Sequence, residues 1–156
     1  MHKIQRTIDI KAPVQNVYDF VNQPSNLPSF WPNMIAVSNI VASKGGCSDF
    51  DWVFKMVGHQ FKGHTKCEEA QPGKLARFKN EAGIPSTLLW KYTGLDGSGT
   101  RLSLEIEYTM PTPIIGKIAE VIAVKINERD LDTMLANLKD VMEHATTGVS
   151  RGAPAH

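Results

Sequence analysis

The last third of the chain carries the pattern that most constrains its fold. This segment runs from Pro111 to His144. After Pro113 it has no proline, and its apolar residues recur at spacings of three and four. That spacing places the apolar side chains on one side of a long α-helix, with lysines and acidic residues on the other. Pro113 suits a helix start, and Gly148 follows the expected end. Because an isolated helix gains little stability from propensity, this one must pack on an apolar surface.

The middle of the chain predicts that surface. Between Met34 and Met110, apolar and polar residues alternate in successive runs, which is typical of β-strands with one buried face. Glycine-containing segments separate several of the runs, and "DGSG" at 96–99 is a strong hairpin signal. Consecutive strands joined by short turns predict an antiparallel meander with one apolar and one polar face.

The start of the chain predicts a strand followed by two short helices. Alternating isoleucines in residues 3–13 indicate a half-buried strand, and helical spacing follows in 14–24. The proline-rich segment 25–33 fits a second short helix and a turn. We therefore expect one α+β domain over residues 1–146, in which a curved antiparallel sheet wraps around a long C-terminal helix. The small and polar residues of 147–156 predict a flexible tail.

Composition excludes several classes of function. The chain has 17 basic and 16 acidic residues and a net charge of +1, so we expect no nucleic-acid partner. Lys117, Glu120 and Lys125 interrupt the most apolar part of the last helix, which excludes a membrane span there. The polar N-terminus is unlike a signal peptide, so we expect a cytoplasmic protein.

Cysteines and histidines predict neither a disulfide framework nor a metal site. Cys47 and Cys67 form no CxxC pair, and we expect Cys67 to be a buried inert thiol and Cys47 an incidental turn residue. The histidines are spread over turns, polar strand positions and the chain ends, with no cluster of metal ligands. We therefore expect no metal and no cofactor.

The order of these elements resembles the helix-grip fold of the START/SRPBCC superfamily. The stretch "IDIKAPVQNVYDFVNQPSNLPSFWPNMIAV" is similar to that superfamily's opening strand, helix and "lPxWxP" turn. "GKIAEVIAV…LANLKDVME" is similar to the closing helix of its polyketide cyclase/dehydrase-like branch. The resemblance covers about residues 3–144. It implies a hydrophobic cavity between sheet and helix, because the superfamily includes lipid, sterol, hormone and coenzyme-Q binders as well as aromatase/cyclases.

The apolar face of the expected sheet supplies the candidate ligand-binding residues. Small-molecule pockets are mostly apolar, and Trp and Tyr add a hydrogen-bonding tip that can orient an amphipathic ligand. We expect Trp90, Tyr92 and Tyr108 to make such contacts. The candidates are Trp31, which would guard the cavity mouth with Phe30, then Trp52, Phe54, Met56, Phe61, Phe78, Leu88, Trp90, Tyr92, Ile106, Tyr108 and Met110 on the sheet, and Ile118, Ile122 and Ile126 on the helix.

The same pattern also fits a solid core. Protein interiors are normally close-packed, and periodicity does not distinguish a packed core from a lined cavity. The family resemblance favours the cavity.

We expect the protein to bind or transport a hydrophobic or amphipathic small molecule, such as a lipid, a quinone or an aromatic polyketide. The alternative is a metal-free polyketide cyclase, aromatase or dehydratase that acts in the same cavity. That chemistry needs a polar group, for which Tyr92 and Tyr108 are candidates and Thr65, Asn80 and Ser86 are weaker ones. The amphipathic start of the last helix leaves transient membrane contact open. The sequence also leaves open whether the protein is a monomer or a homodimer.

Overall fold

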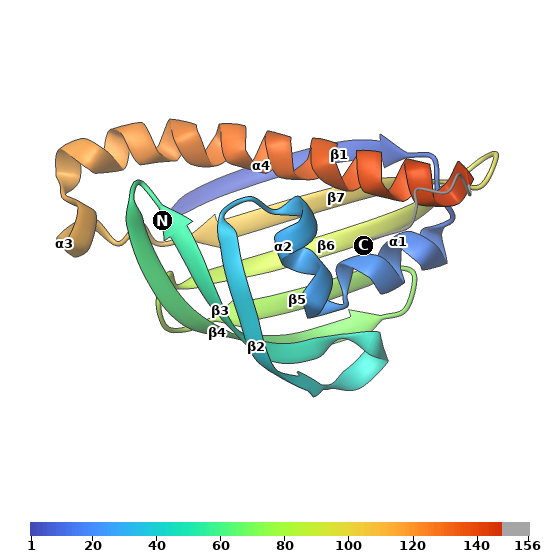
Figure 1. Ribbon diagram of the computed structural model, residues 1–156, viewed down its shortest axis with the longest axis horizontal. Coiled ribbons are helices and arrows are strands. Elements are labelled where there is room, and N and C mark those ends of the chain that lie inside the picture. The colour runs from blue at the N-terminus through green and yellow to red at the C-terminus, as the bar shows by residue number, and fades with distance from the viewer. Residues whose placement is uncertain (148–156) are drawn as a thin grey trace.

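Antiparallel strands form one curved sheet that wraps around a long helix, as the computed structural model shows for residues 1–147 (Figure 1). The strands are β1 (His2–Ile10), β2 (Met34–Ala42), β3 (Ser48–Met56), β4 (His59–Gln71), β5 (Leu75–Asn80), β6 (Ser86–Leu95) and β7 (Gly99–Tyr108). Their order across the seven-stranded sheet is β1-β7-β6-β5-β4-β3-β2, so the first strand lies beside the last.

The helices follow the predicted order. Two short ones come after β1, α1 (Val14–Val21) and α2 (Leu27–Phe30), and the chain closes with α3 (Thr112–Ile115) and α4 (Lys117–Thr147). The predicted α+β helix-grip architecture is confirmed. Within residues 1–147 no helix is both long and apolar enough to cross a membrane. The flexible tail expected at 147–156 lies, apart from Thr147, outside the described residues.

The last helix is interrupted near its start, where we expected it to be continuous. Gly116 has a φ of 88°, a left-handed conformation that glycine adopts without strain, and it separates α3 from α4. Figure 1 shows α3 and the first turns of α4 extending past the end of the sheet. Ile118 there is 84% exposed. The apolar periodicity therefore continues beyond the region that the sheet covers.

The later turns of α4 hold the helix on the rest of the molecule. One face of these turns is buried and packs near β1 and α2. Burial of a large apolar side chain contributes about 1.5–3 kcal/mol, so this face fixes the helix on the sheet. Its buried side chains are Leu131, Met134, Leu135, Leu138 and Met142.

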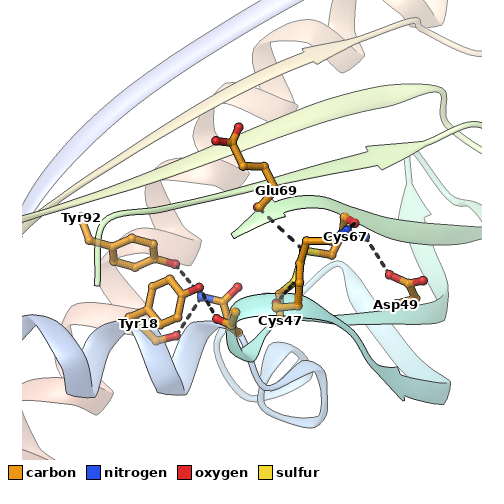
Figure 2. The surroundings of a disulfide bond; sticks show 9 residues. Tyr18, Cys47, Asp49, Cys67, Glu69 and Tyr92 are labelled. Atoms are coloured by element: carbon orange, nitrogen blue, oxygen red, sulfur yellow. Dashed lines mark hydrogen bonds between the residues drawn. A yellow bond between two sulfur atoms is a disulfide. The ribbon is translucent and has the colours of Figure 1, made fainter. Parts of the chain in front are cut away.

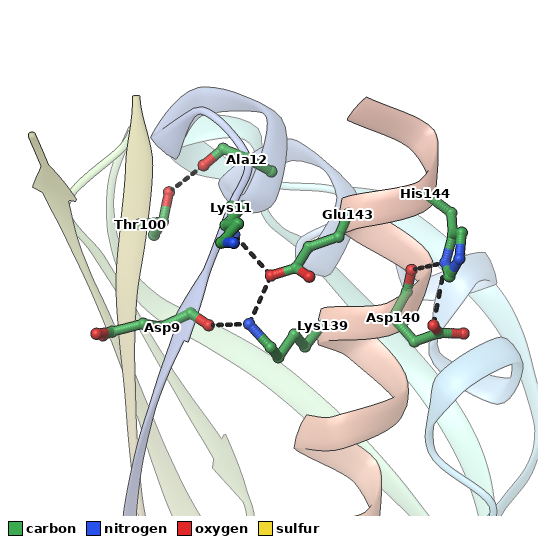
Figure 3. Close-up of polar contacts among 8 residues, drawn as sticks. All are labelled: Asp9, Lys11, Ala12, Thr100, Lys139, Asp140, Glu143 and His144. Atoms are coloured by element: carbon green, nitrogen blue, oxygen red, sulfur yellow. Dashed lines mark hydrogen bonds and ion pairs between the residues drawn. The ribbon is translucent and has the colours of Figure 1, made fainter. Parts of the chain in front are cut away.

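Polar contacts fix the C-terminal part of α4 to the end of β1 (Figure 3). The Lys139 ammonium group donates to the Asp9 carbonyl oxygen at 2.8 Å, and the Glu143 carboxylate accepts the Lys11 backbone N–H at 2.9 Å. Lys139 also pairs with Glu143, and this hydrogen bond lowers the pKa of the Glu143 carboxyl below its ordinary value. These contacts join the last helix to the first strand, although the two are far apart in the sequence.

Cys47 and Cys67 form a disulfide, so the expectation of two free thiols was wrong (Figure 2). Both are 1% exposed, and their Cα atoms lie 6.4 Å apart. The hairpin of β3 and β4 brings them together: Phe50 pairs with Thr65, so the residue just before β3 lies beside Cys67. Asp49 accepts the Cys67 backbone N–H at 2.8 Å. A separation of 20 residues hides this contact in the sequence.

We expect no free thiol in protein purified without reductant. Intact-mass measurement after iodoacetamide treatment in denaturant should show no added group before reduction. The double substitution Cys47→Ser with Cys67→Ser should lower the free energy of unfolding by about 3 kcal/mol, because the crosslink no longer restricts the unfolded chain. Reduced wild type serves as the matched control and should be similarly destabilised. Two alkylated thiols before reduction would contradict the pairing.

Candidate functional site

The concave face of the sheet and the middle of α4 enclose a cavity of about 140 Å³. A buried water needs about 10–15 Å³ measured this way, so the space takes a ligand much larger than water. Apolar and aromatic side chains form most of its wall, with a few polar groups among them. That composition is typical of a small-molecule pocket.

Most of the predicted candidates lie in the wall of this cavity, while their role in ligand binding stays a prediction. The edge-to-face packing of Trp31 on Phe54, with ring centroids 5.8 Å apart, joins the α2 end to β3. Phe30, expected beside Trp31, is 1% exposed and does not line the cavity. The candidates in the wall are Trp31, Trp52, Phe54, Met56, Phe78, Leu88, Trp90, Ile106 and Tyr108.

Other candidates lie elsewhere. Phe61 and Met110 are buried in the core, and Tyr92 is buried behind Asn22 rather than in the wall. Ile118 and Ile122 point to solvent, 84% and 54% exposed, which corrects their expected place in the cavity. The reason is the overhang of the first turns of α4.

Ile126 does not line the cavity either. The α4 residues that line it come later in the helix. Most of the lining residues outside the predicted set stand in turns, at the ends of helices or strands, or on the polar part of α4, whereas Ile4, Phe50 and Leu131 lie on apolar faces of β1, β3 and α4. The lining residues outside the predicted set are Ile4, Val21, Asn22, Pro24, Leu27, Asn33, Met34, Ser48, Phe50, Ile84, Asn127, Asp130 and Leu131.

A hydrogen-bonded cluster around Asn80 forms one polar part of the wall. The Asn80 side-chain oxygen accepts from the Thr65 hydroxyl and, at 3.3 Å, from the Trp52 indole N–H. The Asn80 amide nitrogen donates to the Ser86 hydroxyl at 2.8 Å, and Ser86 donates to the Ile84 carbonyl oxygen at 2.9 Å. These side chains pair with one another, so the cluster fixes the Trp52 ring.

The two candidate tyrosines are unsuited to act as bases. Burial raises the pKa of Tyr108, although its hydrogen bond with Asn127 at 3.2 Å acts the other way. Burial also raises the pKa of Tyr92 far above its ordinary value. Both phenols are therefore neutral at neutral pH, and a base would need a lower pKa.

Asp130 on α4 is the carboxylate that the sequence did not reveal. It lines the cavity, and the Asn33 amide donates to its side chain at 3.1 Å. Asp130 stands in a polar run of the helix, and its place in the wall depends on how α4 lies on the sheet. Among the described residues, no lysine, arginine or histidine lines the cavity, and no group of three or more metal-ligating side chains comes together.

The Trp52 ring depends on a glycine opposite it. Gly63 pairs with Trp52 across β3 and β4, and a Cβ atom at Gly63 would overlap the indole ring and lie 2.7 Å from the Ala82 carbonyl oxygen. The glycine is therefore required for close approach, and its lack of a side chain sets the position of a ring that lines the cavity.

Gly63→Ala should push the Trp52 ring from its place. Overpacking of this kind costs about 1–3 kcal/mol, so we expect a loss of that size in the free energy of unfolding and a shifted tryptophan emission. Urea denaturation followed by fluorescence measures both. Gly94→Ala is the matched control, because a Cβ there meets nothing within 4 Å. Equal stability of the two variants would contradict the close packing of Trp52 on Gly63.

Comparisons with known proteins agree with this architecture. Residues 1–143 match the family described as polyketide cyclase / dehydrase and lipid transport. A solved protein of Thermus thermophilus is 20% identical, with a TM-score of 0.78 over 93% of this chain and 99% of that one. No protein with a curated description matches.

Two further solved structures carry descriptions of interest. The Zhui aromatase/cyclase from Streptomyces is 14% identical, with a TM-score of 0.77 over 96% of this chain and 98% of that one. A START superfamily protein from Mycobacterium smegmatis is 14% identical, with a TM-score of 0.71 over 93% and 99%. At such identities the likeness shows a shared fold.

Proposed function

The chain belongs to the polyketide cyclase/dehydrase and lipid transport family, and from this premise we propose that it binds and carries a hydrophobic or amphipathic small molecule in the cavity described above. The predicted resemblance to the START/SRPBCC superfamily is confirmed. Hydrophobic ligand binding and cyclase activity both fit this family and its structural neighbours.

The observation that supports binding is the wall of the cavity itself. Aromatic and aliphatic side chains surround it, and Tyr108, the tyrosine in its wall, is neutral. A ligand would gain roughly 25 cal/mol for each Å² of apolar surface buried, before the costs of association are deducted. Trp90 and Tyr108, which lie in the wall, are the side chains we propose for orienting the ligand, while Tyr92 would act through Asn22.

Ile106→Trp should fill the cavity and weaken binding of the neutral fluorescent probe N-phenyl-1-naphthylamine by at least about tenfold. The reason is steric, because the new indole would take the space of the ligand. Fluorescence titration measures the affinity, and circular dichroism checks the fold.

Ile118→Trp is the matched control for this experiment. It adds the same side chain to α4 at an exposed position outside the cavity, so binding should not change. Equal affinity of both variants and wild type would place probe binding elsewhere and contradict a site in this cavity.

The cyclase alternative is supported by one observation, the carboxylate of Asp130 in the wall. A carboxylate can accept the proton from a carbon between two carbonyl groups, and the enolate formed can attack a third carbonyl of the same chain. A carrier returns its ligand unchanged, so product analysis after incubation distinguishes the two functions.

The compartment and the surface contacts are further proposals. A cytoplasmic location was expected from the polar N-terminus, and the Cys47–Cys67 disulfide weighs against it, because disulfides persist mainly in oxidising compartments. The near-zero net charge supports the absence of a nucleic-acid partner.

The start of the last helix is the surface that supports transient membrane contact. Apolar side chains are exposed there beside Lys117 and Lys125, a combination that suits an anionic membrane surface. A homodimer would cover the same side chains, so a monomer that meets membranes and a homodimer are competing proposals. The exposed apolar residues are Ile114, Ile118, Val121 and Ile122.

A further inference from the structure

Asn22 lies directly after α1, is 4% exposed and lines the cavity. Its side-chain nitrogen donates to the Tyr18 carbonyl oxygen at 2.9 Å and to the Tyr92 hydroxyl at 3.2 Å. A backbone carbonyl oxygen only accepts hydrogen bonds, so the amide nitrogen has to face Tyr18. The orientation of the Asn22 amide is thereby fixed, with its nitrogen turned to the protein.

The Asn22 side-chain oxygen has no partner. Among the described residues it is the buried side-chain nitrogen or oxygen atom left without a hydrogen bond. Buried polar groups in native proteins are almost always paired, because an unpaired one loses its hydration without compensation. An amide oxygen only accepts, so whatever completes this site has to donate a hydrogen bond.

The surroundings hold Asn22 in place at the wall of the cavity. The rings of Tyr18 and Tyr92 pack edge to face with centroids 5.1 Å apart, and Figure 2 shows the two side chains together. The Tyr18 hydroxyl donates to the Gly45 carbonyl oxygen at 2.6 Å, so this ring is itself fixed. Burial raises the pKa of Tyr92, so the group beside the amide is a neutral phenol.

The charge of the wall restricts the ligand further. Within residues 1–147, Asp130 is the one acidic side chain in the wall, and no lysine, arginine or histidine lines the cavity with it. A carboxylate or phosphate buried here would lose its hydration and find no cation to pair with. A neutral ligand avoids this cost.

The polar cluster around Asn80 leaves no comparable unpaired group for a ligand. Its side-chain amide already bonds Thr65, Trp52 and Ser86, so its groups are paired before a ligand arrives. The unpaired side-chain oxygen of Asn22 is therefore the group that favours a ligand with a hydrogen-bond donor.

Resting on the proposed binding function, we propose that the ligand is uncharged and carries a hydroxyl or N–H group that donates a hydrogen bond to the side-chain oxygen of Asn22. Its body is apolar, and free carboxylates and phosphates are rejected. Phenols, alcohols and amides with an aromatic or aliphatic body fall within this class.

Matched probes test this on the unaltered protein. The probes are 2-naphthol, which is neutral and donates a hydrogen bond, 2-methoxynaphthalene, which cannot donate, and 2-naphthoate, which is an anion. Competition with N-phenyl-1-naphthylamine gives each affinity. We expect 2-naphthol to bind at least about tenfold more tightly than either of the other two, which corresponds to roughly 1.4 kcal/mol.

Two variants assign the preference to Asn22. Asn22→Leu should remove the preference of 2-naphthol over 2-methoxynaphthalene. Asn26→Leu is the matched control, because Asn26 also donates to a backbone carbonyl of α1, that of Phe20 at 3.0 Å, but does not line the cavity. The control should keep the preference. If Asn22→Leu does not fold, the three probes on wild type still decide.

The outcomes separate this inference from the proposed function. Equal binding of 2-naphthol and 2-methoxynaphthalene, or tighter binding of 2-naphthoate, overturns the inference and leaves binding in the cavity intact. The same holds if none of the three displaces a bound N-phenyl-1-naphthylamine. Failure of N-phenyl-1-naphthylamine itself to bind would overturn both.

Discussion

The contact between the buried face of α4 and the sheet is the interaction on which the other features depend. The turns from Leu131 to Met142 place apolar side chains against the rest of the protein, and Lys139 and Glu143 fix the same turns to the end of β1. This placement aims Asn127, Asp130 and Leu131 at the cavity. It also leaves the first turns of the helix beyond the sheet, so one packing arrangement determines both the wall of the site and the exposed apolar patch.

The cavity wall combines a rigid apolar part with a small number of polar groups. The Trp52 ring is held by the Asn80 oxygen on one side and by the close approach of Gly63 on the other. Asn22, at a different place in the wall, keeps an acceptor unpaired. Under the proposed function, a site of this kind would select a ligand by its shape and by one hydrogen bond.

The fold followed from periodicity, because the change from a period of two to a helical period identifies which segments are strands and which are helices. Most of the sheet residues of the cavity followed for the same reason, since alternation assigns Trp52 or Ile106 to the apolar face. Ile118 and Ile122 were misplaced because periodicity identifies the apolar side of a helix but not how far along its length the sheet reaches.

The remaining differences concern contacts between distant segments. The Cys47–Cys67 bond depends on the register of β3 and β4. Asp130 and Asn22 look like a solvated helix residue and a helix end in the sequence, and only the tertiary structure brings them to one cavity.

Native mass spectrometry of the gently purified protein, incubated with an organic-solvent extract of the cells that produce it, shows whether the cavity holds a ligand. We expect a discrete one-to-one complex, whose released component is an apolar, uncharged molecule with a hydroxyl or N–H group, and we expect Ile106→Trp to abolish it. Wild type that retains only the mass of the free protein, with the extract in excess, would contradict ligand binding in this cavity.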